Sequence, residues 1–183
     1  PVSSTIPWLG LRLEEIKDLD SALVIGSFLR KDHPLIDQRL RQAAKKYTQF
    51  NLLSVTADDQ LIKLHSQLTV SPSQLVFAVA ALVKAAAQIK GLQVQQELEA
   101  ITVCQESIKI AQSLLDGERK AIFLGNLVTQ SADSYQLQLL AIELGRLTGA
   151  SVGFLGEGAN SVGARAARFL PTGANARQMF DSP

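Results

Sequence analysis

SVGFLGEGANSVGARAARF, residues 151–169, is the stretch that decides the fold, because an apolar run ends there in glycines and small polar residues before a helical segment. This order predicts a strand, a polar turn and a helix. At the carboxyl end of a buried strand, glycine lets the backbone approach a ligand, and a following helix offers free N–H groups to an anion. The spacing of the glycines is not the G-x-G-x-x-G of a dinucleotide-binding turn, and no G-K-[ST] follows.

Two earlier apolar runs end in the same way, so that VIGS (24–27), FLGN (123–126) and FLGE (154–157) share one pattern. With NLLSV, where we expect a strand over 50–55, they predict an α/β fold with an open, mostly parallel, doubly wound, Rossmann-like sheet. In such a sheet these ends border the crevice where ligands bind. The alternative, to which we give equal weight, is that the glycines only make tight turns.

Helical patterns separate the expected strands. Pro34 suits the first position of a helix, and Ser71-Pro72-Ser73-Gln74 predicts a capping box at the start of an apolar helix that ends before Gly91. A helical pattern covers 93–116, with Gly117 expected as a left-handed cap, and another covers 137–147. We therefore expect a lead-in and short helix over 1–20, one α/β domain over 21–170 and an irregular tail over 171–183, in a fragment of a longer chain.

Composition excludes several classes of function. The 183 residues are 46% hydrophobic and carry a formal net charge of +1, which gives no basis for binding nucleic acid. The longest apolar run, Leu75 to Val83, is too short to span a bilayer, so we expect no direct membrane insertion. One cysteine, Cys104, excludes an internal disulfide and a cysteine-ligated cluster within these residues.

Few side chains suggest catalysis. Cys104 has no histidine partner, and neither His33 nor His65 has a second ligand at metal-binding spacing, so we assign no catalytic residue and no metal site. Glu157 stands in the crevice turn as a possible general base, but a solvated turn carboxylate is the commoner case. The basic residues are interpreted as a solvated helix face: Arg30, Lys31, Arg39, Arg41, Lys45 and Lys46.

Two long segments carry a resemblance to a known family. ALVIGSFLRKDHPLIDQRLRQAAKK (22–46) and FLGNLVTQSADSYQLQLLAIELGRLTGASVGFLGEGANSVGARA (123–166) resemble molybdopterin oxidoreductases of the formate dehydrogenase type. The stretches GSFLRKDHP, LGN and EGANSVGA are most similar to the carboxy-terminal region of the large iron–sulfur subunit of NADH-quinone oxidoreductase (respiratory complex I), a relative of those enzymes. The resemblance covers roughly half of the chain in the same order.

The resemblance implies a ligand crevice that has lost several side chains. Phe28, Thr56 and Ser131 stand where the enzymes have polar groups directed at a pterin guanine dinucleotide. Each lost hydrogen bond costs roughly 0.5–1.5 kcal/mol of affinity. The implied cofactor-binding residues, as a remnant pocket, are Gly26, Ser27, Gly125, Asn126, Thr129, Gln130, Gly158, Asn160 and Ser161.

Two functions are expected from these observations. The first is a structural domain of the complex I hydrophilic arm, without its own redox centre, that contacts other subunits in the cytoplasm at the bacterial inner membrane. Iron–sulfur clusters would lie in the parent chain, and no cofactor in this segment. The alternative is a module that binds a pterin guanine dinucleotide or another nucleotide at the strand ends. A free-standing hydrolase or dehydrogenase has little support, because no nucleophile, base or nicotinamide fingerprint is recognisable.

Overall fold

The computed structural model describes residues 8–57, 59–156, 158, 160–169 and 176–181. Its centre is a five-stranded sheet in the order β3-β2-β1-β4-β5, and every neighbouring pair is parallel. The strands are β1 (Ser21–Ile25), β2 (Gln49–Ser54), β3 (Ser66–Thr69), β4 (Lys120–Leu124) and β5 (Ser151–Phe154). The predicted open, doubly wound α/β fold is therefore confirmed.

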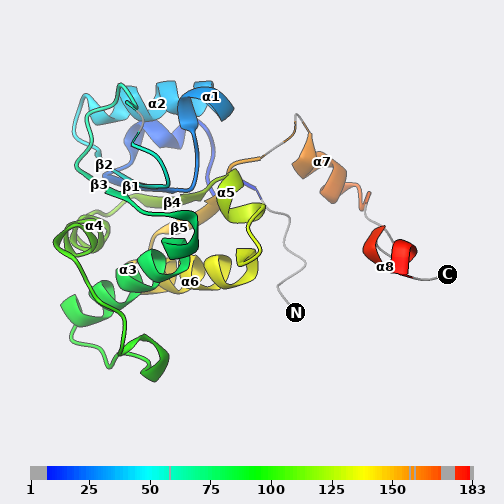
Figure 1. The fold of residues 1–183 in the computed structure, drawn as a ribbon. Helices are drawn as coiled ribbons and strands as arrows, with labels where there is room; N and C mark the ends of the chain where they lie inside the picture. Colours follow the sequence, from blue (N-terminus) through cyan, green and yellow to red (C-terminus); the bar gives the residue numbers. More distant parts are fainter. Residues whose placement is uncertain (1–7, 58, 157, 159, 170–175, 182–183) are drawn as a thin grey trace.

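Helices cover both faces of the sheet (Figure 1). One face carries η1 (Glu15–Asp18), α1 (Leu29–Asp32) and α2 (Pro34–Ala44). The other carries α3 (Leu75–Ile89), α4 (Gln105–Asp116) and α6 (Ser134–Thr148). The short elements are η2 (Pro72–Gln74), η3 (Gln96–Leu98), α5 (Asn126–Thr129), α7 (Ser161–Ala166) and α8 (Ala176–Asp181).

The chain reverses its direction across the sheet at β1. From β1 it passes through α1 and α2 to β2 and then β3, and it returns through α3 and α4 to β4 on the opposite side of β1. The carboxyl ends of β1 and β4 therefore form the topological switch point, where open α/β sheets bind ligands.

The central strands read as continuous apolar runs because each has helices on both sides. In β1, Leu23 and Ile25 join the core under α3, α4 and α6, whereas Ala22 and Val24 join the core under η1 and α2. All five residues of β1 are buried. This is the burial expected of a parallel strand between two helical layers.

Helix α3 lies between α4 and α6 and is the most apolar helix of the domain (Figure 1). Residues 72–89 are long and apolar enough to cross a membrane by composition, with a mean hydropathy of 1.4. In the fold, 56% of this window is buried inside the protein. A core helix of a soluble domain has the same composition, so this helix is weak evidence for a membrane span.

The sequence-based predictions missed strand β3 and several details of helix ends. β3 is an edge strand with the polar sequence SQLT, so it has no apolar run to mark it. The capping box before α3 does not form, because the Ser71 hydroxyl pairs with the Ser73 hydroxyl at 3.1 Å. Gly117 is extended (φ −71°) rather than left-handed, and a Cβ at this position would lie 3.3 Å from the Asp20 Cβ.

Two further predictions, about helical segments, differ from the structure. Only residues 105–116 of the expected helix over 93–116 form α4; Cys104 is its N-cap, and the Cys104 sulfur accepts a hydrogen bond from the Ser107 N–H at 3.4 Å. Cys104 is thus at a helix start, in a structural role. Within the tail expected to be irregular, residues 176–181 form α8.

Asp20 ties the amino-terminal edge of β1 to the turn before β4. Its carboxylate accepts hydrogen bonds from the Arg119 N–H (2.8 Å) and the Glu118 N–H (3.1 Å), and the Arg119 guanidinium lies 3.7 Å away. These N–H donors, above all that of Arg119, hold the pKa of Asp20 below its ordinary value. The charged form is therefore the form that the fold stabilises.

We expect Asp20→Asn to lower the free energy of unfolding at pH 7 by about 1 kcal/mol, because both N–H groups lose a charged acceptor. The folded pKa of Asp20 is depressed, so its contribution is present above the unfolded pKa, near pH 4, and is lost as the pH falls through the folded pKa. Urea unfolding between pH 3 and pH 7 measures this. The control is Glu118→Gln, an exposed carboxylate in the same turn. A constant difference between Asp20→Asn and the native chain across this range would contradict the prediction.

Candidate ligand site at the carboxyl edge of the sheet

The turns after β1 and β4 are packed directly against each other. The Gly125 N–H donates to the Ile25 carbonyl at 2.8 Å, and the Leu127 N–H donates to the Gly26 carbonyl at 3.0 Å. A Cβ atom on Gly125 would collide with the Gly26 carbonyl oxygen and the Ser27 Cβ, and Gly26 has a φ of +64°. These two glycines therefore serve backbone packing, which supports the tight-turn interpretation at these positions.

Three oxygens at this edge, which we call the edge oxygens, have no hydrogen-bond partner among the described residues. They are the Ser27 Oγ after β1, the Thr56 Oγ1 after β2 and the Asn126 Oδ1 after β4, and each atom is buried. A buried polar atom left without a partner costs about 1–3 kcal/mol. Native folds normally give such atoms a partner, in the protein, in ordered water or in a ligand.

The nine predicted cofactor-binding residues fall into two groups. Gly26, Ser27 and Gly125 meet at the switch point, and α5, with Thr129 and Gln130 at its end, continues from Asn126. Gly158 and Asn160 lie in the separate turn between β5 and α7, and Ser161 begins α7. Leu155, directly after β5, still contacts β4, because its N–H donates to the Leu124 carbonyl at 2.8 Å. Nearer to α7, a Cβ on Gly163 would collide with the Asn160 amide, and a Cβ on Gly156 would lie 3.2 Å from the Ser161 hydroxyl. Glu157, the possible general base, lies outside the described residues.

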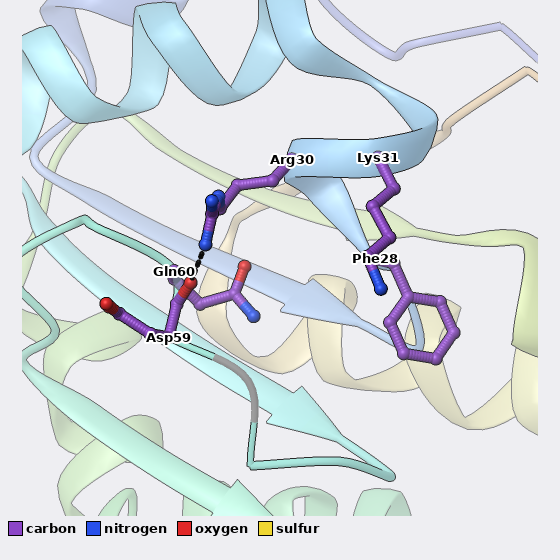
Figure 2. Close-up of a pocket in the computed structure, with 5 residues that line it drawn as sticks. All are labelled: Phe28, Arg30, Lys31, Asp59 and Gln60. Atoms are coloured by element: carbon purple, nitrogen blue, oxygen red, sulfur yellow. Dashed lines mark hydrogen bonds between the residues drawn. The ribbon is translucent and has the colours of Figure 1, made fainter.

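A pocket of about 180 Å³ opens beside the switch point, between the ends of β1 and β2. It is lined by Phe28, Arg30, Lys31, Asp59 and Gln60. Figure 2 shows that the first three reach it from α1 and the turn before it, and that Asp59 and Gln60 face them from the segment after β2. The Arg30 guanidinium donates to the Asp59 carbonyl at 2.5 Å, which joins the two walls.

Two titratable residues with shifted pKa values follow Arg30 and Lys31 in the chain, His33 and Asp37. Burial raises the pKa of Asp37, a residue that is only 5% exposed, and the Arg41 and Arg30 guanidiniums partly oppose this rise. Burial lowers the pKa of His33, against the attraction of Asp32. Neither residue is placed beside a nucleophile by a described contact, and the described residues contain no group of three potential metal ligands.

Sequence reasoning missed this pocket because it interpreted the basic residues as one solvated helix face. The structure separates them: Arg30 and Lys31 belong to α1, which ends at His33 (φ −137°) before α2 begins at Pro34. One available signal was Pro34 itself, since a residue before proline is disfavoured in the helical conformation. That rule predicts a break at His33 and thus a separate turn of helix that directs the two cations to the strand ends.

The fold and the position of the site define the chain as a doubly wound α/β domain with a candidate ligand site at the carboxyl edge of its sheet. No protein-family model matches the chain, and no curated protein matches it. A solved structure with a similar fold is that of the formyltransferase/hydrolase complex (FhcABCD) from Methylorubrum extorquens in complex with methylofuran. Its TM-score is 0.52 at 18% sequence identity, over 86% of this chain and 44% of that chain. This chain thus spans less than half of the length of that relative, and the likeness shows the fold alone.

The identification with the large iron–sulfur subunit of complex I was wrong: the similar solved structure belongs to a formyltransferase/hydrolase complex. The functional terms that followed from that identification lose their support as well. They are oxidoreductase, NADH dehydrogenase and electron transport. The physical reason is that strand–glycine–polar turns are requirements of the architecture, as the contacts of Gly26 and Gly125 demonstrate. Unrelated proteins share a fold without sharing a function.

Proposed function

We propose that this domain is a non-catalytic module that binds a nucleotide at the carboxyl edge of its sheet, with a pterin guanine dinucleotide among the candidate ligands. The observation that carries the proposal is the pocket between the ends of β1 and β2, beside the switch point. Ligands of open α/β sheets bind outside the carboxyl ends of the strands, and this pocket opens at that edge, next to the switch point between β1 and β4.

The chemistry of the edge supports a ligand with both polar and anionic parts. Ser27 and Thr56 have hydroxyls that donate or accept hydrogen bonds, and Asn126 has an amide; a base edge or a ribose offers matching groups. Arg30 and Lys31 supply positive charge on the side of β2. A nucleotide combines these requirements in one molecule.

A second candidate function is a packing module in a multi-subunit assembly. Tyr135, Leu139 and Ile142 recur at helical spacing on α6 and are 57%, 45% and 50% exposed, so α6 presents an apolar stripe to solvent. Such a stripe is typical of surfaces that contact other proteins. The similar solved structure is also a chain of a complex. A soluble, cytoplasmic domain with partner subunits is part of this second proposal, as are cofactors held elsewhere in a longer parent.

Calorimetric titration of the 183-residue chain with GMP and GDP tests the nucleotide proposal. We expect saturable binding, and we expect Ser27→Ala to raise the dissociation constant about 3- to 10-fold, the effect of one lost hydrogen bond. The same variant should keep its stability, because the Ser27 hydroxyl has no partner to lose among the described residues. Ser73→Ala, an exposed hydroxyl before α3, is the matched control.

Oxidised-pterin fluorescence of the purified chain extends the test to the dinucleotide. Absence of nucleotide binding together with absence of pterin fluorescence would overturn the nucleotide proposal and leave the packing module as the better account.

A further inference from the structure

We propose that the pocket lined by Phe28, Arg30, Lys31, Asp59 and Gln60 is a phosphomonoester site, in which the phosphate lies between Arg30 and Lys31 and the organic part packs on Phe28. The inference rests on the proposed function in that both use this pocket. It names a chemical class, the aromatic phosphomonoester, whose binding is measured without any nucleoside.

The first argument is charge. The pocket has two cationic side chains and one carboxylate. That carboxylate is used by its own loop, since the Asp59 Oδ1 accepts from the Leu61 N–H at 2.9 Å, and Figure 2 shows it directed away from Lys31. The ion pairs found among the described residues are Arg12–Glu15, Arg119–Asp20 and Arg146–Glu143, so neither pocket cation forms a direct ion pair in that part of the chain.

The second argument is the geometry of the Arg30 guanidinium. An N–H group on Nη1 donates a hydrogen bond to the Asp59 carbonyl, and this bond holds the guanidinium at the pocket. A guanidinium has five N–H donors, so most of its donors stay available. A preorganised arginine fork matches the oxygens of a phosphate, and lysine adds a point charge.

The third argument concerns the remaining walls. Gln60 is only 5% exposed, and its amide is directed into the space between Arg30 and Phe28 (Figure 2). The Phe28 ring forms the apolar wall on the other side, below the Lys31 ammonium. A flat apolar ring beside cations and an amide suits a planar organic group that carries an anion, because aromatic rings pack face against face or edge.

The size of the pocket limits the ligand to one planar organic group that carries one anion. Pockets that enclose a whole drug-sized ligand measure about 300–1,000 Å³, and this one measures about 180 Å³. The charge favours phosphate over carboxylate: a phosphomonoester carries about −1.5 to −2 at pH 7, which matches two cations, whereas a carboxylate carries −1.

Titration of the 183-residue chain with phenyl phosphate, followed by ³¹P NMR and calorimetry at low ionic strength, tests this site. We expect saturable binding of phenyl phosphate, with benzoate and inorganic phosphate each weaker by about tenfold or more. Lys31→Met should weaken phenyl phosphate about tenfold, because one charge-assisted contact is lost. Phe28→Ala should reduce the preference for phenyl phosphate over inorganic phosphate and leave inorganic phosphate unchanged.

Controls separate this site from the rest of the surface. Lys45→Met removes an exposed cation at the end of α2 and should have no effect. Arg30→Lys keeps the positive charge but removes the forked arrangement of N–H donors of the guanidinium. Thermal melting of this variant shows whether the substitution also destabilises the segment after β2. Thermal melting of Lys31→Met, at an exposed position, should match that of the native chain.

Each outcome of these titrations supports or overturns the proposed phosphomonoester site. Absence of saturable phenyl phosphate binding, or an equal loss in Lys45→Met, would overturn the proposal. Binding of phenyl phosphate without binding of GMP or GDP would retain the pocket and refute the nucleotide function. Loss through Ser27→Ala instead of Lys31→Met would move the phosphate to the switch point and refute the assignment to this pocket.

Discussion

Gly125→Ala should lower the free energy of unfolding by about 3 kcal/mol, the upper end of the cost of overpacking a close-packed site. The new Cβ would meet the Gly26 carbonyl oxygen, the Gly26 carbonyl carbon at 2.8 Å and the Ser27 Cβ. Two of these three atoms belong to the backbone, so no change of rotamer relieves the collision. The turn after β1 also has no freedom to withdraw, since the Gly26 carbonyl already accepts from the Leu127 N–H.

Urea unfolding followed by circular dichroism measures this loss. The matched control is Gly158→Ala, because no atom of the described residues lies within 4 Å of a Cβ at Gly158. We expect that variant to stay within about 0.5 kcal/mol of the native chain, as surface substitutions usually do. Gly125 and Gly158 were both predicted to bind a cofactor. Comparing the stability of their alanine variants therefore distinguishes a glycine that packing requires from one that only leaves room for a ligand. Equal stability of the two variants would refute the packing role of Gly125.

The architecture was predictable because burial on two faces leaves a simple sequence signal. The apolar runs at 22–25 and 121–124 have no polar face, and Pro34 and Gly149 mark a helix start and a helix end. β3 was not predictable in this way. It is an edge strand with a single apolar residue, Leu68, so its pairing with β2 depends on tertiary context rather than on its own composition.

The sequence predicted where in the fold the candidate site lies, but it did not predict which residues line it. The edge of the sheet follows from topology, and Ser27 and Asn126 lie there as expected. Arg30 and Gln60 are 30 residues apart in sequence and meet only because β1 and β2 pair in parallel. No local pattern signals that meeting. The identification with the complex I subunit was wrong for a related reason: two of the glycines in the stretches quoted for it, Gly26 and Gly125, are required by backbone packing.

Gly153→Ala is the second substitution for which we expect a loss of about 3 kcal/mol. β5 is an edge strand of the sheet, and the segment at 8–10 crosses it at close range: the Phe154 N–H donates to the Trp8 carbonyl at 2.8 Å. A Cβ on Gly153 would collide with the Leu9 carbonyl, and a Cβ on Gly10, which has a φ of +82°, would lie 2.8 Å from the Val152 carbonyl oxygen. The methyl group therefore forces the crossing segment away from the strand.

Trp8 reports this displacement, because it is the single tryptophan of the chain and is 50% exposed in the native fold. We expect Gly153→Ala to increase quenching of Trp8 fluorescence by acrylamide already without denaturant, and to shift the urea midpoint measured by circular dichroism. Ser151→Ala, an exposed position on the same strand, should change neither signal. If Gly153→Ala kept native stability and native quenching, the crossing segment would not hold the edge of β5. The expected response would instead establish that this segment protects an edge strand that is otherwise open to pairing with another chain.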